Sequence, residues 1–229
     1  MPWCAVVLSL FPDMFPGPLA YSLLGTALRA GAWSLEARDI RDHGVGRHRD
    51  VDGRPAGGGA GMVLRPDVTA AAIDAARAAH EANLPTIYLS PRGAPFTRDM
   101  AADLASGPGA VFLAGRFEGL DQRVIEARDM REVSIGDYVL TGGELAAMVM
   151  IDAIVRRLPG VLGNAASLSD ESFEQPRLEH PQFTKPVTWD GRTIPPVLTS
   201  GDHAAVERWR RDQSEQLTRA RRPDLIDPS

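Results

Sequence analysis

The chain has 229 residues, of which 44% are hydrophobic and 24% are charged, and its formal net charge at pH 7 is −5. These values are typical of a globular protein with one large domain or with one medium and one small domain. No apolar run approaches the roughly 18 residues that a membrane-spanning helix needs, and the apolar N-terminal run lacks the basic residues of a signal peptide, so we expect no membrane association.

The number of cysteines limits the cellular compartments and the kinds of site that are expected. Cys4 is the single cysteine, so an internal disulfide is impossible and a cysteine-based metal site is not supported. A chain without disulfides is typical of a reducing compartment, which predicts a cytoplasmic location. We expect no metal site.

Alternating apolar and alanine-rich segments indicate the fold class. Short apolar runs that predict buried strands occur at residues 5–10, 62–64, 86–89 and 110–113. Alanine-rich segments at 66–82 and 97–104 lie between them and predict helices. This alternation predicts an α/β fold with a mostly parallel sheet covered by helices.

A very apolar helix is predicted over residues 145–158, where Pro159-Gly160 ends it. A helix of this character is buried on most sides, either in the core or at a subunit interface.

The character of the chain changes after residue 160. Residues 160–196 are rich in Pro, Asn, Ser and Gln and show no periodicity, which is typical of a linker or a functional loop. Asp202 then predicts the cap of a helix that runs to about residue 221. Its predicted apolar face consists of Val206, Trp209, Leu217 and Ala220. A domain boundary is therefore expected near residues 160–180.

Two basic clusters, at residues 38–54 and 208–222, stand out against the negative net charge. Local patches rather than overall charge set affinity for nucleic acid. A solvated surface is the more common explanation of either cluster alone, so neither identifies RNA by itself.

Glycines gather at residues 57–61, at Gly115 and Gly119, at Gly136 and at 142–143. Glycine permits positive φ angles and close approach of a ligand to the backbone, so four such clusters favour a pocket lined by main chain. None of them matches the dinucleotide or P-loop motif, which sets a nucleotide-hydrolysing P-loop protein aside.

A series of short motifs then extends over nearly the whole chain. In chain order they are SLFPDMF (9–15), Asp52, GGGAGM (57–62), YLSP (88–91), GRFEG (115–119), SIGDYVL (134–140), PGVLGN (159–164), PPVL (195–198), SGDH (200–203) and RRP (221–223). Each motif alone is weakly specific. Their order and spacing together closely resemble the TrmD-type tRNA (guanine-N1)-methyltransferases of the SPOUT class.

The resemblance implies a domain organisation that periodicity does not reveal. Residues 1–160 would form an α/β domain with a deep trefoil knot, residues 161–180 a linker, and residues 181–229 a small helical tRNA-binding domain. It also implies a homodimer with the active site at the subunit interface. S-adenosyl-L-methionine would lie in the knot, held by Tyr88, Leu89, Ser90, Pro91, Gly115, Glu118, Ile135, Gly136, Asp137, Tyr138, Val139, Leu140, Gly142 and Gly143.

The implied reaction transfers a methyl group to N1 of the guanosine immediately 3′ of the tRNA anticodon (guanine37). Such an enzyme must take the target base out of the stack before it reacts. The tRNA contacts implied by the resemblance are Asp52, Gly57, Gly58, Gly59 and Ser167.

The chemistry of this reaction accounts for the candidate catalytic residues. N1 of guanine carries a proton, so a carboxylate must remove it while a cation near O6 stabilises the developing negative charge. Arg156 matches the family arginine at O6. Glu171 matches the family's catalytic aspartate by register, and Asp170 beside it is the competing candidate. The sulfonium methyl group is already activated, so the transfer itself requires no metal.

The chain departs from the family pattern at that glutamate and at Ala56 and Ala60 in the glycine segment. Two alternatives remain: a SPOUT methyltransferase acting on another RNA nucleotide, and a non-catalytic RNA-binding protein with the same fold. Retention of Arg156 and of both acids favours the enzyme.

Overall fold

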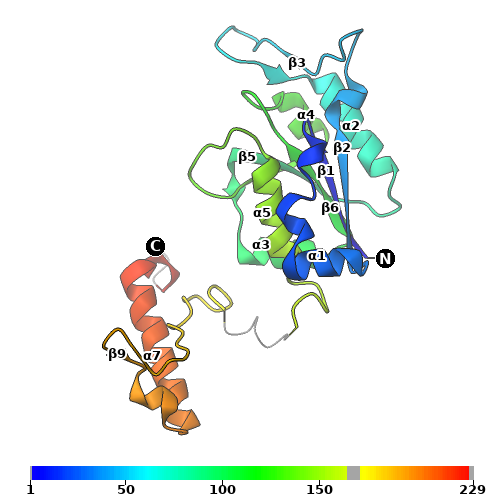
Figure 1. Ribbon diagram of the computed structural model, residues 1–229. Coiled ribbons are helices and arrows are strands. Elements are labelled where there is room, and N and C mark those ends of the chain that lie inside the picture. Colours follow the sequence, from blue (N-terminus) through cyan, green and yellow to red (C-terminus); the bar gives the residue numbers. More distant parts are fainter. Residues whose placement is uncertain (1, 164–170, 227–229) are drawn as a thin grey trace. The chain divides into compact units, whose positions relative to one another are not determined.

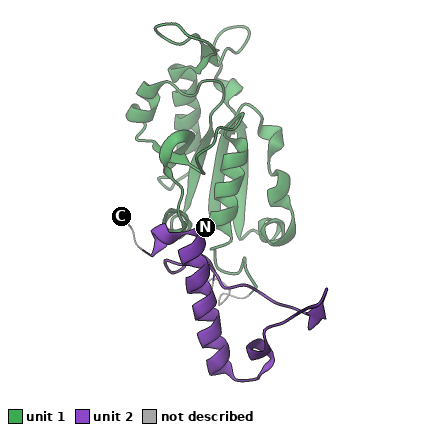
Figure 2. Cartoon of the chain, turned by 90° about the vertical axis from the view of Figure 1, so that its left-hand side faces the viewer, with its two compact units in different colours: residues 1–163 green, residues 164–229 purple. Residues whose placement is uncertain are grey.

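The computed structural model describes residues 2–163 and 171–226 (Figure 1). The chain divides into two compact units, residues 1–163 and residues 164–229 (Figure 2). The segment expected as a linker spans this division, because residues 161–163 belong to the first unit and residues 171–180 to the second. None of the helices in the described ranges combines the length and apolar character needed to cross a membrane.

A five-stranded sheet forms the centre of the first unit, and all of its strand pairs are parallel. This confirms the predicted α/β class with a mostly parallel sheet. The strands, in spatial order, are β2 (Trp33–Asp39), β1 (Trp3–Ser9), β6 (Gly109–Ala114), β5 (Thr86–Pro95) and β7 (Arg131–Ser134).

Helices cover both faces of this sheet and bury a separate hydrophobic core on each side (Figure 1). Successive strand residues point to opposite faces, so Ala5 and Val7 belong to one core and Val6 and Leu8 to the other. The helices of the first core are α1 (Ser22–Arg29), α3 (Arg98–Ser106) and α5 (Glu144–Val155), and those of the second are α2 (Pro66–Ala78) and α4 (Gln122–Ala127).

Helix α5 contributes more buried residues to the first core than α1 or α3 does. Its apolar residues are buried through Val155, except that Ala153 is partly buried and that Leu145 and Val149, one turn apart, are about half exposed. The predicted helix extended to residue 158, and the structure ends it three residues earlier, at Val155.

A strand forms within residues 62–64, as predicted, but it is short and lies outside the main sheet. Only β4 (Val63–Leu64) forms, and it pairs antiparallel with β3 (Asp52–Gly53) in a separate two-stranded sheet. The sequence pattern also missed β2 and β7, the two edge strands. An edge strand pairs on one side only and tolerates charged side chains, so β2 (WSLEARD) and β7 (REVS) lack an apolar run.

The second unit is built around α7 (His203–Arg221). The Asp202 side chain accepts a hydrogen bond of 3.0 Å from the Ala205 amide, which confirms the predicted cap. The hairpin of β8 (Thr188–Trp189) and β9 (Arg192–Thr193) lies in the segment expected to be irregular. The short 3₁₀ helices of the two units are η1 (Pro12–Met14), η2 (Gly17–Ala20), η3 (Ile40–His43), η4 (Pro196–Thr199) and η5 (Pro223–Leu225).

Polar residues form the most buried face of α7, contrary to the prediction. Ser214 donates to the Leu178 carbonyl oxygen at 2.6 Å, and the Leu178 amide donates to Thr218 Oγ1 at 2.9 Å. Ala220, assigned to the apolar face, is exposed. The helix therefore binds residues 171–180 partly through hydrogen bonds to their backbone.

Candidate active site

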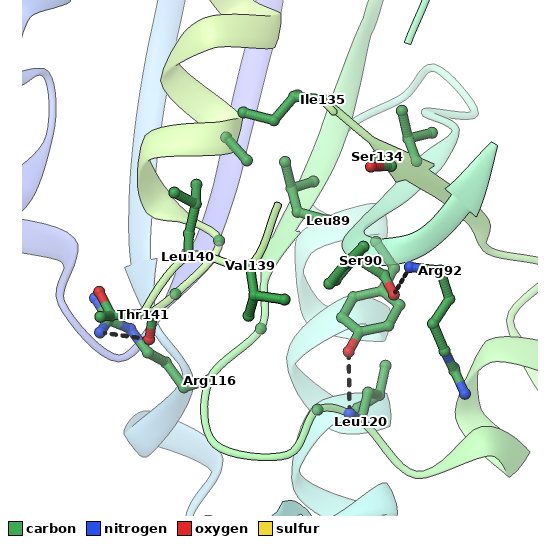
Figure 3. A pocket seen from close by; sticks show the side chains of 18 of the residues that line it. Leu89, Ser90, Arg92, Arg116, Leu120, Ser134, Ile135, Val139, Leu140 and Thr141 are labelled. Atoms are coloured by element: carbon green, nitrogen blue, oxygen red, sulfur yellow. Dashed lines mark hydrogen bonds between the residues drawn. The ribbon is translucent and has the colours of Figure 1, made fainter. Parts of the chain in front are cut away.

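A cavity of about 310 Å³ lies in the first unit at the carboxyl ends of β5, β6 and β7 (Figure 3). Crevices at the carboxyl ends of parallel strands are the usual ligand sites of open α/β sheets. The lining residues come from three segments, joined by Ala146 of α5: residues 88–92 within β5, residues 115–120 after β6, and residues 133–136 with 138–143 at the end of β7 and in the loop that follows it.

The structure thus brings together residues from the three loops in which a methyl donor is expected. Of the residues predicted to bind the donor, all except Asp137 line the cavity. Arg116, Phe117 and Thr141 also line it; they lie within the expected donor loops but were not named as donor contacts. The lining residues outside those loops are Arg92, Gly119, Leu120, Val133, Ser134 and Ala146.

The cavity opens at an irregularity in the pairing of β5 with β7. Residues 86–90 are buried, whereas Pro91 and the residues after it are largely exposed. The pairing of β5 with β7 shifts register between Leu89 and Ala94. The turn that follows is held by Ser90, whose Oγ accepts a hydrogen bond of 3.2 Å from the Arg92 amide.

Tyr88 forms part of the inner wall. Its phenol oxygen accepts a hydrogen bond of 3.2 Å from the Leu120 amide. Burial raises the pKa of Tyr88 above its ordinary value, and the hydrogen bond from Leu120 partly opposes this shift. The phenol is therefore neutral at physiological pH.

A buried polar network lies beside the cavity. Glu144, the first residue of α5, is 1% exposed, and its Oε1 accepts hydrogen bonds from Arg116 Nε at 3.2 Å and from Ser9 Oγ at 2.7 Å. Its Oε2 lies 2.8 Å from Arg116 Nη2, which makes the two side chains an ion pair. Arg116 Nη1 also donates to the Thr141 carbonyl oxygen at 3.1 Å. The guanidinium of Arg116 lies 4.5 Å from the centre of the Phe11 ring.

Gly142 leaves room for this network. A Cβ at this position would lie 2.2 Å from Arg116 Nε and 2.5 Å from Glu144 Oε2. The glycine is therefore required by contacts within the protein, whereas the sequence suggested that it admits a ligand.

The candidate catalytic residues belong to different units. Arg156, partly buried, is the C-cap of α5, and its amide donates to the Asp152 carbonyl oxygen at 3.1 Å. Glu171 lies in the second unit, where it lines a groove of about 130 Å³ with Arg177, Arg210 and other polar residues. Asp170 and Ser167 lie outside the described residues.

The described residues expected to contact tRNA, Asp52 and the glycines 57–59, are not part of the cavity lining. Asp52 is in β3, paired with Leu64 of β4. Gly57, Gly58 and Gly59 lie in the connection between these strands, where all three adopt positive φ angles. Among the described residues, no group of three or more His, Cys, Asp or Glu side chains is arranged to hold a metal ion.

Comparison with known protein families matches residues 4–228 to the family described as tRNA (Guanine-1)-methyltransferase TrmD. The chain belongs to this family. It is similar to proteins named tRNA (guanine-N(1)-)-methyltransferase from three bacteria. The protein of Rhodopseudomonas palustris (strain ATCC BAA-98 / CGA009) is 62% identical over 225 residues, which cover 98% of this chain and 90% of the relative. That of Chelativorans sp. (strain BNC1) is 59% identical, covering 98% and 95%. That of Mesorhizobium japonicum is 58% identical, covering 99% and 97%.

Family membership explains why the motifs located the cavity loops, but not the network beside them. No motif of the sequence assigned a role to Glu144, and Arg116 was named only as part of the GRFEG motif. Glu144 lies 28 positions from Arg116 and 135 positions from Ser9 in the sequence, so no local pattern pairs these residues. The signal available in the sequence was the position of both residues next to glycines of the motifs.

Proposed function

We propose that the protein is a tRNA (guanine-N1)-methyltransferase that transfers a methyl group from S-adenosyl-L-methionine to N1 of the guanosine 3′ of the anticodon (guanine37). The observation that carries the proposal is the family match over residues 4–228, together with a cavity lined by three loops of the family motifs. Relatives that are about 60% identical over nearly the whole chain carry this enzyme name.

The chemistry of the cavity suits this methyl donor. Its volume of about 310 Å³ falls in the range of small-molecule sites, about 300–1,000 Å³. Leu89, Ile135 and Leu140 offer apolar surface for a purine ring, and Glu118 offers a carboxylate for a positively charged group. The bound donor supplies a methyl group activated by its sulfonium, so the protein has to bind, orient and remove one proton.

Arg156 and Glu171 supply the acid–base chemistry in this proposal. The guanidinium of Arg156 stabilises the negative charge that grows on O6 as the proton leaves N1. Glu171 accepts that proton, with Asp170 as the alternative base. Arg156 belongs to the first unit and Glu171 to the second, so the proposed chemistry draws on both units.

The proposal includes the trefoil knot and the homodimer of the family. The convergence of three loops at the carboxyl ends of β5, β6 and β7 supports the knot. Exposed apolar side chains at the cavity and on α5 support a second subunit, since patches of this kind mark interaction sites. They are Phe117, Tyr138, Val139, Leu140, Leu145 and Val149, of which Val139 is 81% exposed.

The tRNA is proposed to contact both units. In the first unit these contacts involve Asp52 and the glycines 57–59, and Ser167 is a further candidate. In the second unit α7 carries arginines at its surface, which suit the phosphate backbone of RNA. A tRNA substrate agrees with the proposed cytoplasmic location.

Transfer of labelled methyl groups from S-adenosyl-L-methionine tests the function. The substrates are two tRNA transcripts that differ only in the nucleotide 3′ of the anticodon, guanosine or adenosine. We expect labelling of the guanosine transcript alone. Equal labelling of both would indicate a methyltransferase for another nucleotide, and tRNA binding without labelling would indicate a non-catalytic RNA-binding protein.

A further inference from the structure

The ion pair between Arg116 and Glu144 is buried to an unusual degree. The Glu144 side chain is 1% exposed and that of Arg116 is 20% exposed. Removing two charges from water costs about as much free energy as their attraction returns, so such a pair is a poor source of stability. A favourable charge at the N-terminus of α5 would not need burial either, because that effect also operates at the surface.

The ion pair of Arg116 and Glu144 connects several segments of the chain. Arg116 lies in the loop after β6, and its Nη1 donates to the Thr141 carbonyl oxygen in the loop after β7 at 3.1 Å (Figure 3). Glu144 begins α5, and Ser9 at the end of β1 donates to it at 2.7 Å. Three separate segments therefore meet at this ion pair: the end of β1, the loop after β6, and the loop after β7 with the first residue of α5.

Neighbouring backbone contacts reinforce this connection. The Gly143 amide donates to the Gly115 carbonyl oxygen at 2.9 Å, so the same two loops are also joined directly. Gly142, which lacks a Cβ, allows the guanidinium and the carboxylate to meet between them.

We propose that Ser9, Arg116 and Glu144 are positioning residues that hold the loops after β6 and β7 in the arrangement that binds the methyl donor. Both loops line the cavity, so their separation sets its width. A pocket held in shape before binding loses less conformational freedom when the donor enters, which increases affinity. This inference rests on the proposed donor site.

Calorimetric titration with S-adenosylhomocysteine tests the proposal. The sulfur of this probe is uncharged, so a change in its binding reports loop position more than repulsion of a sulfonium. Glu144→Gln keeps the shape of the side chain but removes its charge, and Arg116→Lys keeps the charge but loses the planar fork. We expect each variant to bind the probe about tenfold more weakly, and Gly142→Ala to do the same.

A surface pair of similar geometry provides the control. Arg128 Nε and Nη2 each lie 2.7 Å from a carboxylate oxygen of Asp74, between α4 and α2, and neither residue lines the cavity. Asp74→Asn should leave the dissociation constant of the probe unchanged.

Hydrogen exchange separates positioning from general stability. In Glu144→Gln we expect faster exchange in residues 115–120 and 135–143, with β1 and β6 still protected. The inference is overturned if the variants bind the probe with an affinity within about twofold of wild type. It is also overturned if the unfolded fraction of each variant accounts for its weaker binding. If the wild-type protein binds no S-adenosylhomocysteine, the donor site fails and the inference fails with it. If wild type binds and the variants bind equally well, only the inference fails.

Discussion

Tyr88 and Leu120 join two walls of the cavity, since the Leu120 amide donates a hydrogen bond of 3.2 Å to the Tyr88 phenol oxygen. Tyr88 is in the buried first half of β5, and Leu120 is in the segment after β6. Both residues are less than a tenth exposed. Tyr88→Phe keeps the ring but leaves the Leu120 amide without this acceptor. We expect the free energy of unfolding in urea at pH 8 to fall by about 1–3 kcal/mol. No change in the urea midpoint would show that water replaces the phenol.

The same tyrosine predicts a pH dependence. Burial raises the pKa of Tyr88, so the native protein keeps this proton at pH values where the unfolded chain loses it. The free energy of unfolding should therefore fall as pH rises above about 10, the ordinary pKa of tyrosine. This part of the decline should be absent in Tyr88→Phe and present in Tyr21→Phe, since Tyr21 is 74% exposed. Identical alkaline slopes in both variants would contradict the assignment.

The close approach of Gly61 to the Glu118 side chain connects the glycine segment 57–61 with the cavity. A Cβ on Gly61 would lie 2.3 Å from Glu118 Oε1 and 2.4 Å from its Cγ. We expect Gly61→Ala to displace the Glu118 side chain and to raise the dissociation constant for S-adenosylmethionine about tenfold. Gly58→Ala is the matched control, because Gly58 has a similar φ of +84° with no atom within 4 Å of the added Cβ. If both substitutions weakened binding of S-adenosylmethionine equally, backbone strain and not the displaced Glu118 side chain would explain the weaker binding.

The identity of the general base is open to a direct comparison. Glu171→Gln and Asp170→Asn each remove one carboxylate with little change of shape. We expect Glu171→Gln to lower kcat by about 10²–10⁴-fold and Asp170→Asn to have a much smaller effect, measured in single-turnover methyl transfer. Glu174→Gln controls for the loss of a nearby charge. Loss of activity in Asp170→Asn alone would show that the register assigned to Glu171 is wrong.

Arginines on α7 predict the salt dependence of tRNA binding. Arg208 and Arg211 are exposed, whereas Arg222 is held by Asp224 at 2.6 Å. If Arg208 contacts a phosphate, Arg208→Gln should reduce the slope of log K against log salt by about 1, and Arg211→Gln likewise. Arg222→Gln should change the slope less. Unchanged slopes in both test variants would exclude these arginines from the tRNA contact.

The sequence predicted those parts of the fold in which local pattern and burial agree. The runs at β1, β5 and β6 are apolar because these strands have neighbours on both sides and helices on both faces. The edge strands β2 and β7 contain charged residues and were missed. The two residues of β4 are part of an apolar run, but they pair with β3 outside the main sheet.

The candidate site shows a similar division. Motif order located the three cavity loops, because each loop is a continuous segment. The Arg116–Glu144–Ser9 network joins residues that are distant in sequence, so only the fold brings them together. Gly142, predicted as a donor contact, lines the cavity, and its missing side chain also makes room for that network.

Nucleoside analysis of methylated tRNA tests the central claim most directly. A tRNA with guanosine 3′ of the anticodon is incubated with the protein and S-adenosylmethionine, digested, and analysed by mass spectrometry against nucleoside standards. The account predicts 1-methylguanosine at that single position and none when adenosine replaces the guanosine. A methyl group on another atom of the base, on a ribose oxygen or at another nucleotide would contradict it.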